Sequence, residues 1–227
     1  MATDAEATRP VRRIAVILQN RARLGTLVCH IPLVSSLRRR YPDAHLSVVA
    51  PFAEASLLVA DGLADALVRW PRGVWAQVRT VYALRADLLI TLRPMSIFIT
   101  LLVGLSGARI RLGFATTLAR LLFTAVRPRD LEIYRVLNYL QLLDPIAVPR
   151  SLSDYLEAAA AAVPPAIDPR EEHVCLMPGG ASPFKLWGID NFLALAAQIR
   201  AARPTARFVF VLGPGERALI ERIRASP

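Results

Sequence analysis

Residues 13–50 read RIAVILQNRARLGTLVCHIPLVSSLRRRYPDAHLSVVA, and this stretch decides the fold. Two short apolar runs, at 13–18 and 45–50, have the length and composition of buried parallel strands. Between them, a glycine-containing turn at 20–26 leads into a helical pattern over 27–41 that ends in three arginines. A strand, a helix and a second strand in this order predict the first unit of a parallel α/β sheet.

The same alternation continues along the chain. Further strands are expected at 66–68, 87–92, 109–114, 173–177 and 207–212, and helices at 53–60, 74–84, 94–106, 118–124, 131–143, 190–202 and 217–224. Pro94 fits a first helical turn, where its missing N–H is not needed. Asp190 or Asn191 is expected to cap the helix that follows. Strands alternating with helices predict parallel sheets covered on both faces.

A proline-rich connector divides this pattern into two sets. The sequence therefore predicts an α/β fold with two Rossmann-like parallel-sheet domains. We expect a disordered N-terminus over 1–11, an N-terminal domain over 12–150, a linker over 151–170 and a C-terminal domain over 171–227. The last part has only about two strands and two helices, whereas a parallel sheet usually has several strands. The second domain is therefore expected to be incomplete, through truncation or because it needs a partner.

The excess of positive over negative residues lies in the N-terminal part of the chain. Residues 1–150 hold 20 Arg against 10 Asp and Glu, whereas residues 151–227 hold 8 Lys and Arg against 8 Asp and Glu. Such a surface suits nucleic acid, anionic lipid or a phosphorylated acceptor, and the alternative is a compositional bias toward arginine. Because no nucleic-acid-binding signature is present, nucleic acid is not expected as a partner.

The sequence predicts a cytoplasmic protein. No apolar run reaches the roughly 18 residues of a membrane span, and the nearest, 95–108, is expected to be a buried helix. A peripheral contact at the inner membrane face stays open. Cys29 and Cys175 show neither disulfide nor metal spacing and are expected to be small buried residues. The three tryptophans are expected to be packing residues: Trp70, Trp75 and Trp187.

Residues 177–187, MPGGASPFKLW, follow a predicted strand and carry the elements of a phosphate loop. Gly179 and Gly180 let the backbone approach an anion closely, Ser182 adds a hydroxyl donor, and Lys185 adds charge. The chain has 27 arginines and this single lysine, whose slim stem suits a crowded phosphate pocket. The alternative is a surface loop with a solvated lysine.

A second loop, GPGE at 213–216, follows the next predicted strand. Ligands of open α/β sheets bind beyond the carboxyl ends of the strands, and an acidic residue there can accept hydrogen bonds from ribose hydroxyls. Glu216 is the candidate for this role. The alternative is an ordinary acidic residue at the start of a helix, where the dipole also favours it.

Together these loops resemble the nucleotide-binding half of the family 9 glycosyltransferases, the ADP-heptose:lipopolysaccharide heptosyltransferase family. The resemblance rests on MPGGASPFKLWGIDNFLALAAQI and FVFVLGPGE, and on the opening stretch quoted above, with DLLITLRP and RIRLGF in family order. It covers nearly all of residues 12–224. The motif positions kept are Pro178, Gly179, Pro183, Lys185, Trp187 and Glu216.

The resemblance implies a GT-B fold, in which two Rossmann-like domains flank an active site. It implies that the N-terminal domain binds a lipopolysaccharide core or a related anionic, lipid-linked glycan, and that the C-terminal domain binds an ADP-sugar or similar donor. Lys185 would contact the diphosphate and Glu216 the ribose. The sugar, heptose-like, would be transferred with inversion, without a metal and without a cofactor.

The chain departs from the family pattern in ways that bear on catalysis. Thr26 follows Gly25 where the family has an aspartate acting as general base, and threonine cannot accept that proton near neutral pH. His30, four residues on, could substitute, although a lone histidine near a helix start is more often structural. Met177 replaces a histidine, and the family's later glycine-rich segment is absent. The alternative is therefore a catalytically impaired or truncated remnant that retains part of the donor site.

Overall fold

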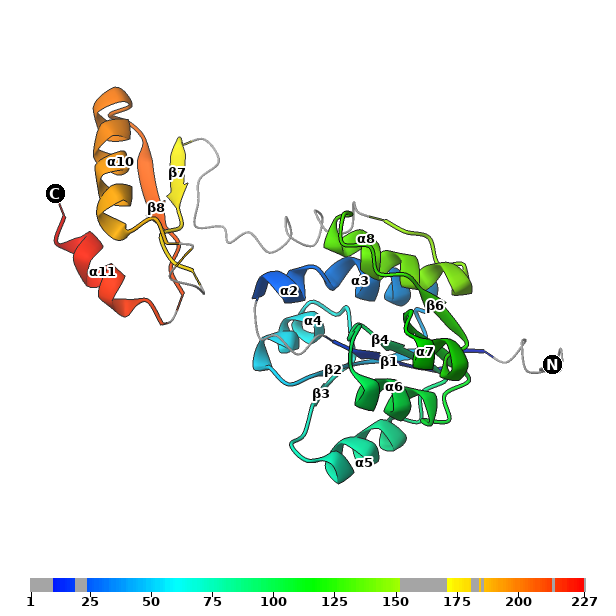
Figure 1. Ribbon diagram of the computed structural model, residues 1–227. Helices are drawn as coiled ribbons and strands as arrows, with labels where there is room; N and C mark the ends of the chain where they lie inside the picture. The colour runs from blue at the N-terminus through cyan, green and yellow to red at the C-terminus, as the bar shows by residue number, and fades with distance from the viewer. Residues whose placement is uncertain are drawn as a thin grey trace. The chain divides into compact units, whose positions relative to one another are not determined.

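A computed structural model describes residues 10–18, 24–151, 171–180, 184, 186–213 and 215–226 of the chain. The chain divides into two compact units, Met1–Ala161 and Ala162–Pro227. The ribbon in Figure 1 shows a helix-covered sheet in the first unit and a smaller strand-and-helix unit at the C-terminal end. Most of the expected N-terminal segment 1–11 and of the linker 151–170 lies outside the described residues.

The first unit is built on a parallel sheet of six described strands in the order β3-β2-β1-β4-β5-β6. The strands are β1 (Arg13–Ile17), β2 (His45–Ala50), β3 (Ala66–Arg69), β4 (Leu88–Thr91), β5 (Ile110–Phe114) and β6 (Ala125–Arg127). This is the order of a doubly wound sheet, and the strand order reverses between β1 and β4. The predicted strands of this unit are confirmed, and β6, at the sheet edge, is a strand that the sequence pattern missed.

Helices cover both faces of this sheet. One face carries α2 (Leu24–Val28), α3 (Ile31–Arg40), η1 (Ala53–Ser56), α4 (Leu57–Ala60), α8 (Arg135–Leu140) and η2 (Gln141–Ile146), and the other carries α5 (Val74–Leu84), α6 (Ile97–Gly104) and α7 (Thr117–Leu122). Figure 1 shows α3 and α8 on one side of the strands and α5 and α6 on the other. Ile14 and Val16 pack in the first layer, and Ala15 and Ile17 in the second, as the period of two in a strand requires.

The prediction of a single helix over 27–41 is wrong. The structure has two helices, α2 and α3, separated by a turn at Cys29 and His30. Pro32 lies in the first turn of α3, where the lack of a backbone N–H costs nothing. In the middle of a longer helix the same proline would remove a hydrogen bond and clash with the preceding turn, so the chain starts a new helix here.

Two other helix boundaries differ from expectation. The helix α6 begins at Ile97, after Ser96, whose hydroxyl oxygen accepts a hydrogen bond from the Ile99 N–H at 3.3 Å. Pro94 therefore lies before the helix rather than in its first turn. The helix α8 begins only at Arg135 and passes into the 3-10 turn η2.

The second unit contains a two-stranded parallel sheet of β7 (His173–Leu176) and β8 (Arg207–Phe210), with α10 (Ile189–Ala202) and α11 (Arg217–Arg224). The residue that caps α10 is Gly188, whose φ of 93° favours glycine. The predicted caps, Asp190 and Asn191, lie inside the helix instead. No residue of α10 or α11 is buried. Cys175 is exposed and Cys29 is half-buried, so the expectation of two buried cysteines is wrong.

The close packing around Gly113 in β5 should make this position sensitive to substitution. A Cβ added at Gly113 would lie 2.5 Å from Cε2 of Phe123 and 3.0 Å from Cγ2 of Thr91. We expect Gly113→Ala to lower the free energy of unfolding by roughly 1–3 kcal/mol, as measured by urea denaturation. The control is Gly25→Ala in α2, where an added Cβ meets nothing within 4 Å. Equal stabilities of the two variants would contradict the packing described here.

Candidate functional site

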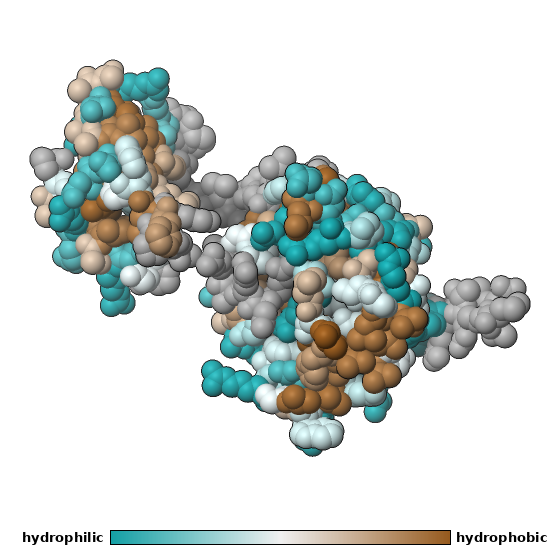
Figure 2. All heavy atoms as spheres, in the orientation of Figure 1, coloured by the Kyte–Doolittle hydropathy of each residue, from teal (hydrophilic) through white to brown (hydrophobic). Residues whose placement is uncertain are grey.

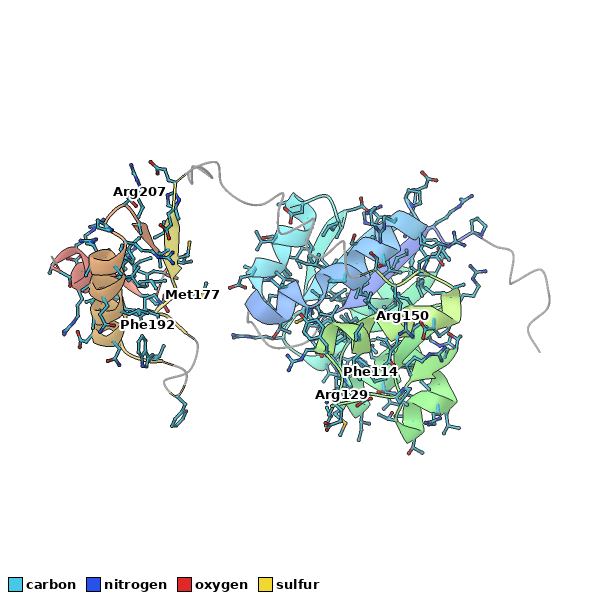
Figure 3. All side chains as sticks on the ribbon, turned by 90° about the horizontal axis from the view of Figure 1, so that it is seen from above. Phe114, Arg129, Arg150, Met177, Phe192 and Arg207 are labelled. Atoms are coloured by element: carbon cyan, nitrogen blue, oxygen red, sulfur yellow. The ribbon has the colours of Figure 1, made fainter. Side chains whose placement is uncertain are left out.

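Two loops leave the same edge of the small sheet. Because β7 and β8 are parallel, with Leu176 paired to Phe210, the chain leaves both strands at their common carboxyl end. The Val211 N–H donates to the Leu176 carbonyl at 2.9 Å and extends the pairing by one residue. Figure 3 shows Met177 at this end and Arg207 at the opposite end. Ligands of α/β sheets bind beyond the carboxyl edge.

The Glu216 carboxylate joins these two loops. Its Oε2 accepts a hydrogen bond from the Gly213 N–H at 2.7 Å. A Cβ on Gly179 would lie 1.8 Å from Oε1 of the same carboxylate, so only glycine permits this approach. Glu216 directly precedes α11, but its side chain makes no capping hydrogen bond to that helix. A helix-start acid alone therefore does not account for the position of this carboxylate.

Gly180 and Leu186 lie close together in the segment after β7. A Cβ on Gly180 would lie 3.3 Å from Cδ2 of Leu186. Ser182 and Lys185 lie outside the described residues, and their predicted roles stay predictions. Trp187 packs edge-on against Phe192 with ring centroids 5.2 Å apart, although 55% of its surface is exposed. Trp75 is 85% exposed, so the expectation of a packing role is wrong for that tryptophan.

The carboxyl edge of the first unit carries an arginine that the sequence interpretation passed over. Arg93 follows β4 at the point where the strand order reverses, and its Nε donates to the Leu18 carbonyl beyond β1 at 3.0 Å. Its guanidinium lies 4.8 Å from the ring centroid of Trp70. Burial lowers the pKa of Arg93 to about 10, which leaves it charged at neutral pH. Its place directly after a predicted strand was the signal that could have identified it.

Thr26 lies after β1, in the first helix of this unit. It lies in α2 and is buried, with 5% of its surface exposed. Gly25 beside it is exposed. The Thr26 hydroxyl cannot act as a general base near neutral pH, and its correspondence to the aspartate of the resembling family stays a prediction.

His30 is buried completely and does not share a helix face with Thr26, since α2 ends at Val28. Among the described residues neither ring nitrogen has a hydrogen-bond partner, and the ring packs edge-on against Tyr139 at 5.0 Å. Burial, with a further contribution from the charge of Arg135, lowers the pKa of His30 to about 3. A base must accept a proton readily, so these properties favour the structural interpretation of His30.

The described ranges contain neither a metal site nor a membrane-spanning helix. No group of three or more His, Cys, Asp and Glu side chains there could hold a metal ion. None of the helices in the same ranges is long and apolar enough to cross a membrane.

Comparison with known proteins identifies the fold. Neither a protein-family model nor a curated protein matches the sequence. A glycosyl transferase family 9 structure from Veillonella parvula superposes with a TM-score of 0.65 at 18% identity, over 93% of this chain and 65% of its own. The E. coli heptosyltransferase WaaC superposes over 93% of this chain in two structures. With ADP-2-deoxy-2-fluoro heptose the TM-score is 0.67 at 15% identity, over 73% of that protein, and with ADP it is 0.68 at 14%, over 71%.

At these identities the likeness establishes the fold. The expected α/β fold of GT-B type is confirmed, and the two-stranded sheet fits an incomplete second domain. The chain spans just under two thirds of the length of the Veillonella protein.

The buried His30 predicts a pH dependence of stability. In the unfolded chain the histidine titrates near its ordinary pKa of 6.5, whereas in the folded protein it does so at about 3. The unfolded state therefore binds the proton first, and stability present above pH 6.5 is lost as the pH falls toward 3. We expect a loss of about 2 kcal/mol between pH 6.5 and 5 in chemical denaturation. His30→Phe, which keeps an aromatic ring against Tyr139, should remove that component, and identical pH profiles would refute the assignment.

Proposed function

We propose that the chain is a glycosyltransferase whose second unit binds the nucleotide-sugar donor and whose first unit binds the acceptor. The observation that carries the proposal is the contact of the Glu216 carboxylate with Gly179 and with the Gly213 N–H. It brings together the two loops on which the family resemblance rests. The similar WaaC structures hold ADP and an ADP-heptose analogue, which supports an ADP-sugar as the donor of this chain.

Each of the two loops would bind a different part of the donor. The glycine-rich loop after β7 would hold the diphosphate through backbone N–H groups, the Ser182 hydroxyl and the Lys185 ammonium. The N-terminus of α10, which follows this loop, favours the negative charge further. Glu216 would accept hydrogen bonds from the ribose hydroxyls through the carboxylate oxygen that faces Gly179.

The acceptor would bind at the carboxyl edge of the first unit, where the strand order reverses between β1 and β4. Arg93, held by the Leu18 carbonyl and by the Trp70 ring, presents a permanent positive charge there. This charge suits an anionic acceptor, and we propose a lipopolysaccharide core or a related lipid-linked glycan. Guanidinium groups bind phosphates and carboxylates in a fixed, often bidentate geometry.

The reaction would be a single displacement with inversion. A hydroxyl of the acceptor attacks the anomeric carbon of the sugar and loses its proton to water, the bond to the diphosphate breaks, and the nucleoside diphosphate leaves with the bonding electrons. Lys185 and the backbone donors of the glycine-rich loop would stabilise the developing negative charge on the departing group. No metal is needed for this step, because these groups supply the positive charge.

A second candidate function is a donor-binding protein with impaired turnover. Two observations favour it: Thr26, to which the resemblance assigns the position of the family's base, is a buried hydroxyl, and His30 is buried with a low pKa. Neither residue can readily take the proton of the acceptor hydroxyl. In this case the donor site would bind nucleotide normally while sugar transfer stays slow.

Calorimetric titration with ADP tests the donor site. We expect Gly179→Ala, Glu216→Gln and Lys185→Ala each to weaken ADP binding by about tenfold or more, as for a lost charge-assisted hydrogen bond. The matched controls on α11, Glu221→Gln and Arg224→Ala, should bind as the unchanged protein does, because both side chains are exposed and lie away from the two loops. Unaltered ADP affinity in Lys185→Ala and Gly179→Ala would refute the assignment.

A transfer assay with Thr26→Asp separates the two candidate functions. If the chain is a transferase that lacks only an efficient base, the carboxylate should raise the transfer rate by about a hundredfold. Thr26→Asn, which has nearly the same shape but cannot accept a proton, should give no gain. If Thr26→Asp keeps its affinity for ADP and still gains no activity, the donor-binding protein is the correct interpretation.

A further inference from the structure

The outer side of α6 is an exposed apolar stripe. Ile97 and Leu101 in α6, and Leu105 directly after it, are spaced four residues apart and expose 74%, 39% and 62% of their surfaces. The opposite side of the same helix is buried in the core, so α6 is apolar all round. A helix of this composition is normally covered on every side, and here one side faces solvent.

The stripe is part of a larger apolar surface. Met95, just before α6, and Leu121 on the neighbouring helix α7 are 82% and 79% exposed. The two helices pack closely, since a Cβ on Gly104 would lie 2.7 Å from Cβ of Leu122. Figure 2 shows hydrophobic side chains gathered over α6 and α7 on one face of the first unit. We call these five residues, Met95, Ile97, Leu101, Leu105 and Leu121, the α6 patch.

The chain segment that carries the α6 patch is almost free of negative charge. Residues 66–129 contain ten arginines and one acidic residue, Asp87. The Asp87 carboxylate is engaged within the fold, because its Oδ2 accepts hydrogen bonds from the N–H groups of Arg12 and Arg13, both at 2.9 Å. The chain segment that carries the patch is therefore strongly cationic.

A basic groove adjoins the end of the α6 stripe. It has a volume of about 1560 Å³, lies at the amino ends of the strands, and includes Ser106, the residue directly after Leu105. Five arginines line it: Arg12, Arg40, Arg85, Arg109 and Arg111. The groove is at the opposite edge of the sheet from the proposed acceptor site, so it is a separate feature of the fold.

We propose that the α6 patch and the basic groove form a docking surface for an anionic lipid bilayer. Apolar side chains enter the boundary between headgroups and acyl chains, and neighbouring arginines attract the lipid phosphates. A second copy of this chain fits less well, because a twofold contact through α6 would bring the same arginine-rich segment face to face. Nucleic acid would use the groove but would leave the apolar stripe exposed.

Vesicle flotation with the purified full chain tests the docking surface. The protein should float with vesicles of equal parts phosphatidylglycerol and phosphatidylcholine, and about tenfold less with phosphatidylcholine alone. The variant I97Q/L105Q should bind the anionic vesicles at least about fivefold less. The control L57Q alters an exposed leucine in α4, on the other face of the sheet, and should float normally. Ile97→Trp, which places an interfacial aromatic in the stripe, should also retain binding.

The contribution of the arginines to vesicle binding is tested with a matched pair of double variants. The variant R12Q/R85Q removes two exposed arginines of the groove, and R217Q/R224Q removes two exposed arginines of α11. Only the first should reduce flotation, by about fivefold, and about 0.5 M salt should reduce binding of the unchanged protein similarly.

Three results would overturn the proposal. The first is that the protein does not float with anionic vesicles. The second is that I97Q/L105Q floats as well as the unchanged protein at equal melting temperature. The third is that light scattering shows a dimer, which I97Q/L105Q converts to a monomer. The last result would identify the patch as an interface between copies. No nucleotide-sugar enters these experiments, so their outcome is independent of the proposed donor site.

Discussion

Parallel pairing of the strands is the constraint on which both candidate sites depend. In each sheet it places the carboxyl ends of successive strands at one edge, so segments far apart in the sequence leave the sheet side by side. In the second unit this brings Gly179 and Glu216 into contact. In the first unit it brings Arg93, beyond β4, to the carbonyl of Leu18, beyond β1. The polar groups of each site are positioned by the backbone before any ligand is considered.

The two units differ in how completely they are built. The first has six described strands with helices on both faces, and its core residues alternate strictly between the two layers. The second has two described strands and two helices without a buried residue. Even so, the small unit retains the contact between its two loops. The proposed donor site therefore lies in a unit whose hydrophobic core is slight.

The regular elements of this chain could be predicted because their signals are local. Apolar runs bounded by turn residues identified the strands, and the extent of α5 (Val74–Leu84) and α11 (Arg217–Arg224) followed from their periodicity. The break between α2 and α3 was missed because periodicity continues across Cys29 and His30, although Pro32 carried the signal. The contact between Gly179 and Glu216 was not predicted, since nothing local in either loop specifies its partner, and the family resemblance assigned only the two loops to one nucleotide site.

Other features of the site could not be read from the sequence because they depend on tertiary packing. His30 resembled a catalytic substitute by its spacing from Thr26, but its burial against Tyr139 and the charge of Arg135 lower its pKa. Arg93 acquires its significance from the reversal of strand order, which a linear pattern does not display. The exposed side of α6 was likewise hidden, because an apolar run does not say which of its faces remains uncovered.

If the loops after β7 and β8 form one nucleotide site, as we propose, hydrogen–deuterium exchange with and without ADP will reveal it. We expect slower exchange on ADP binding in two separate segments, residues 177–187 and 211–217, because the ligand would contact both loops at once. The amides around β1 and β2, in the other unit, should exchange as before. Protection confined to one of the two loops, or found only in the first unit, would contradict the claim.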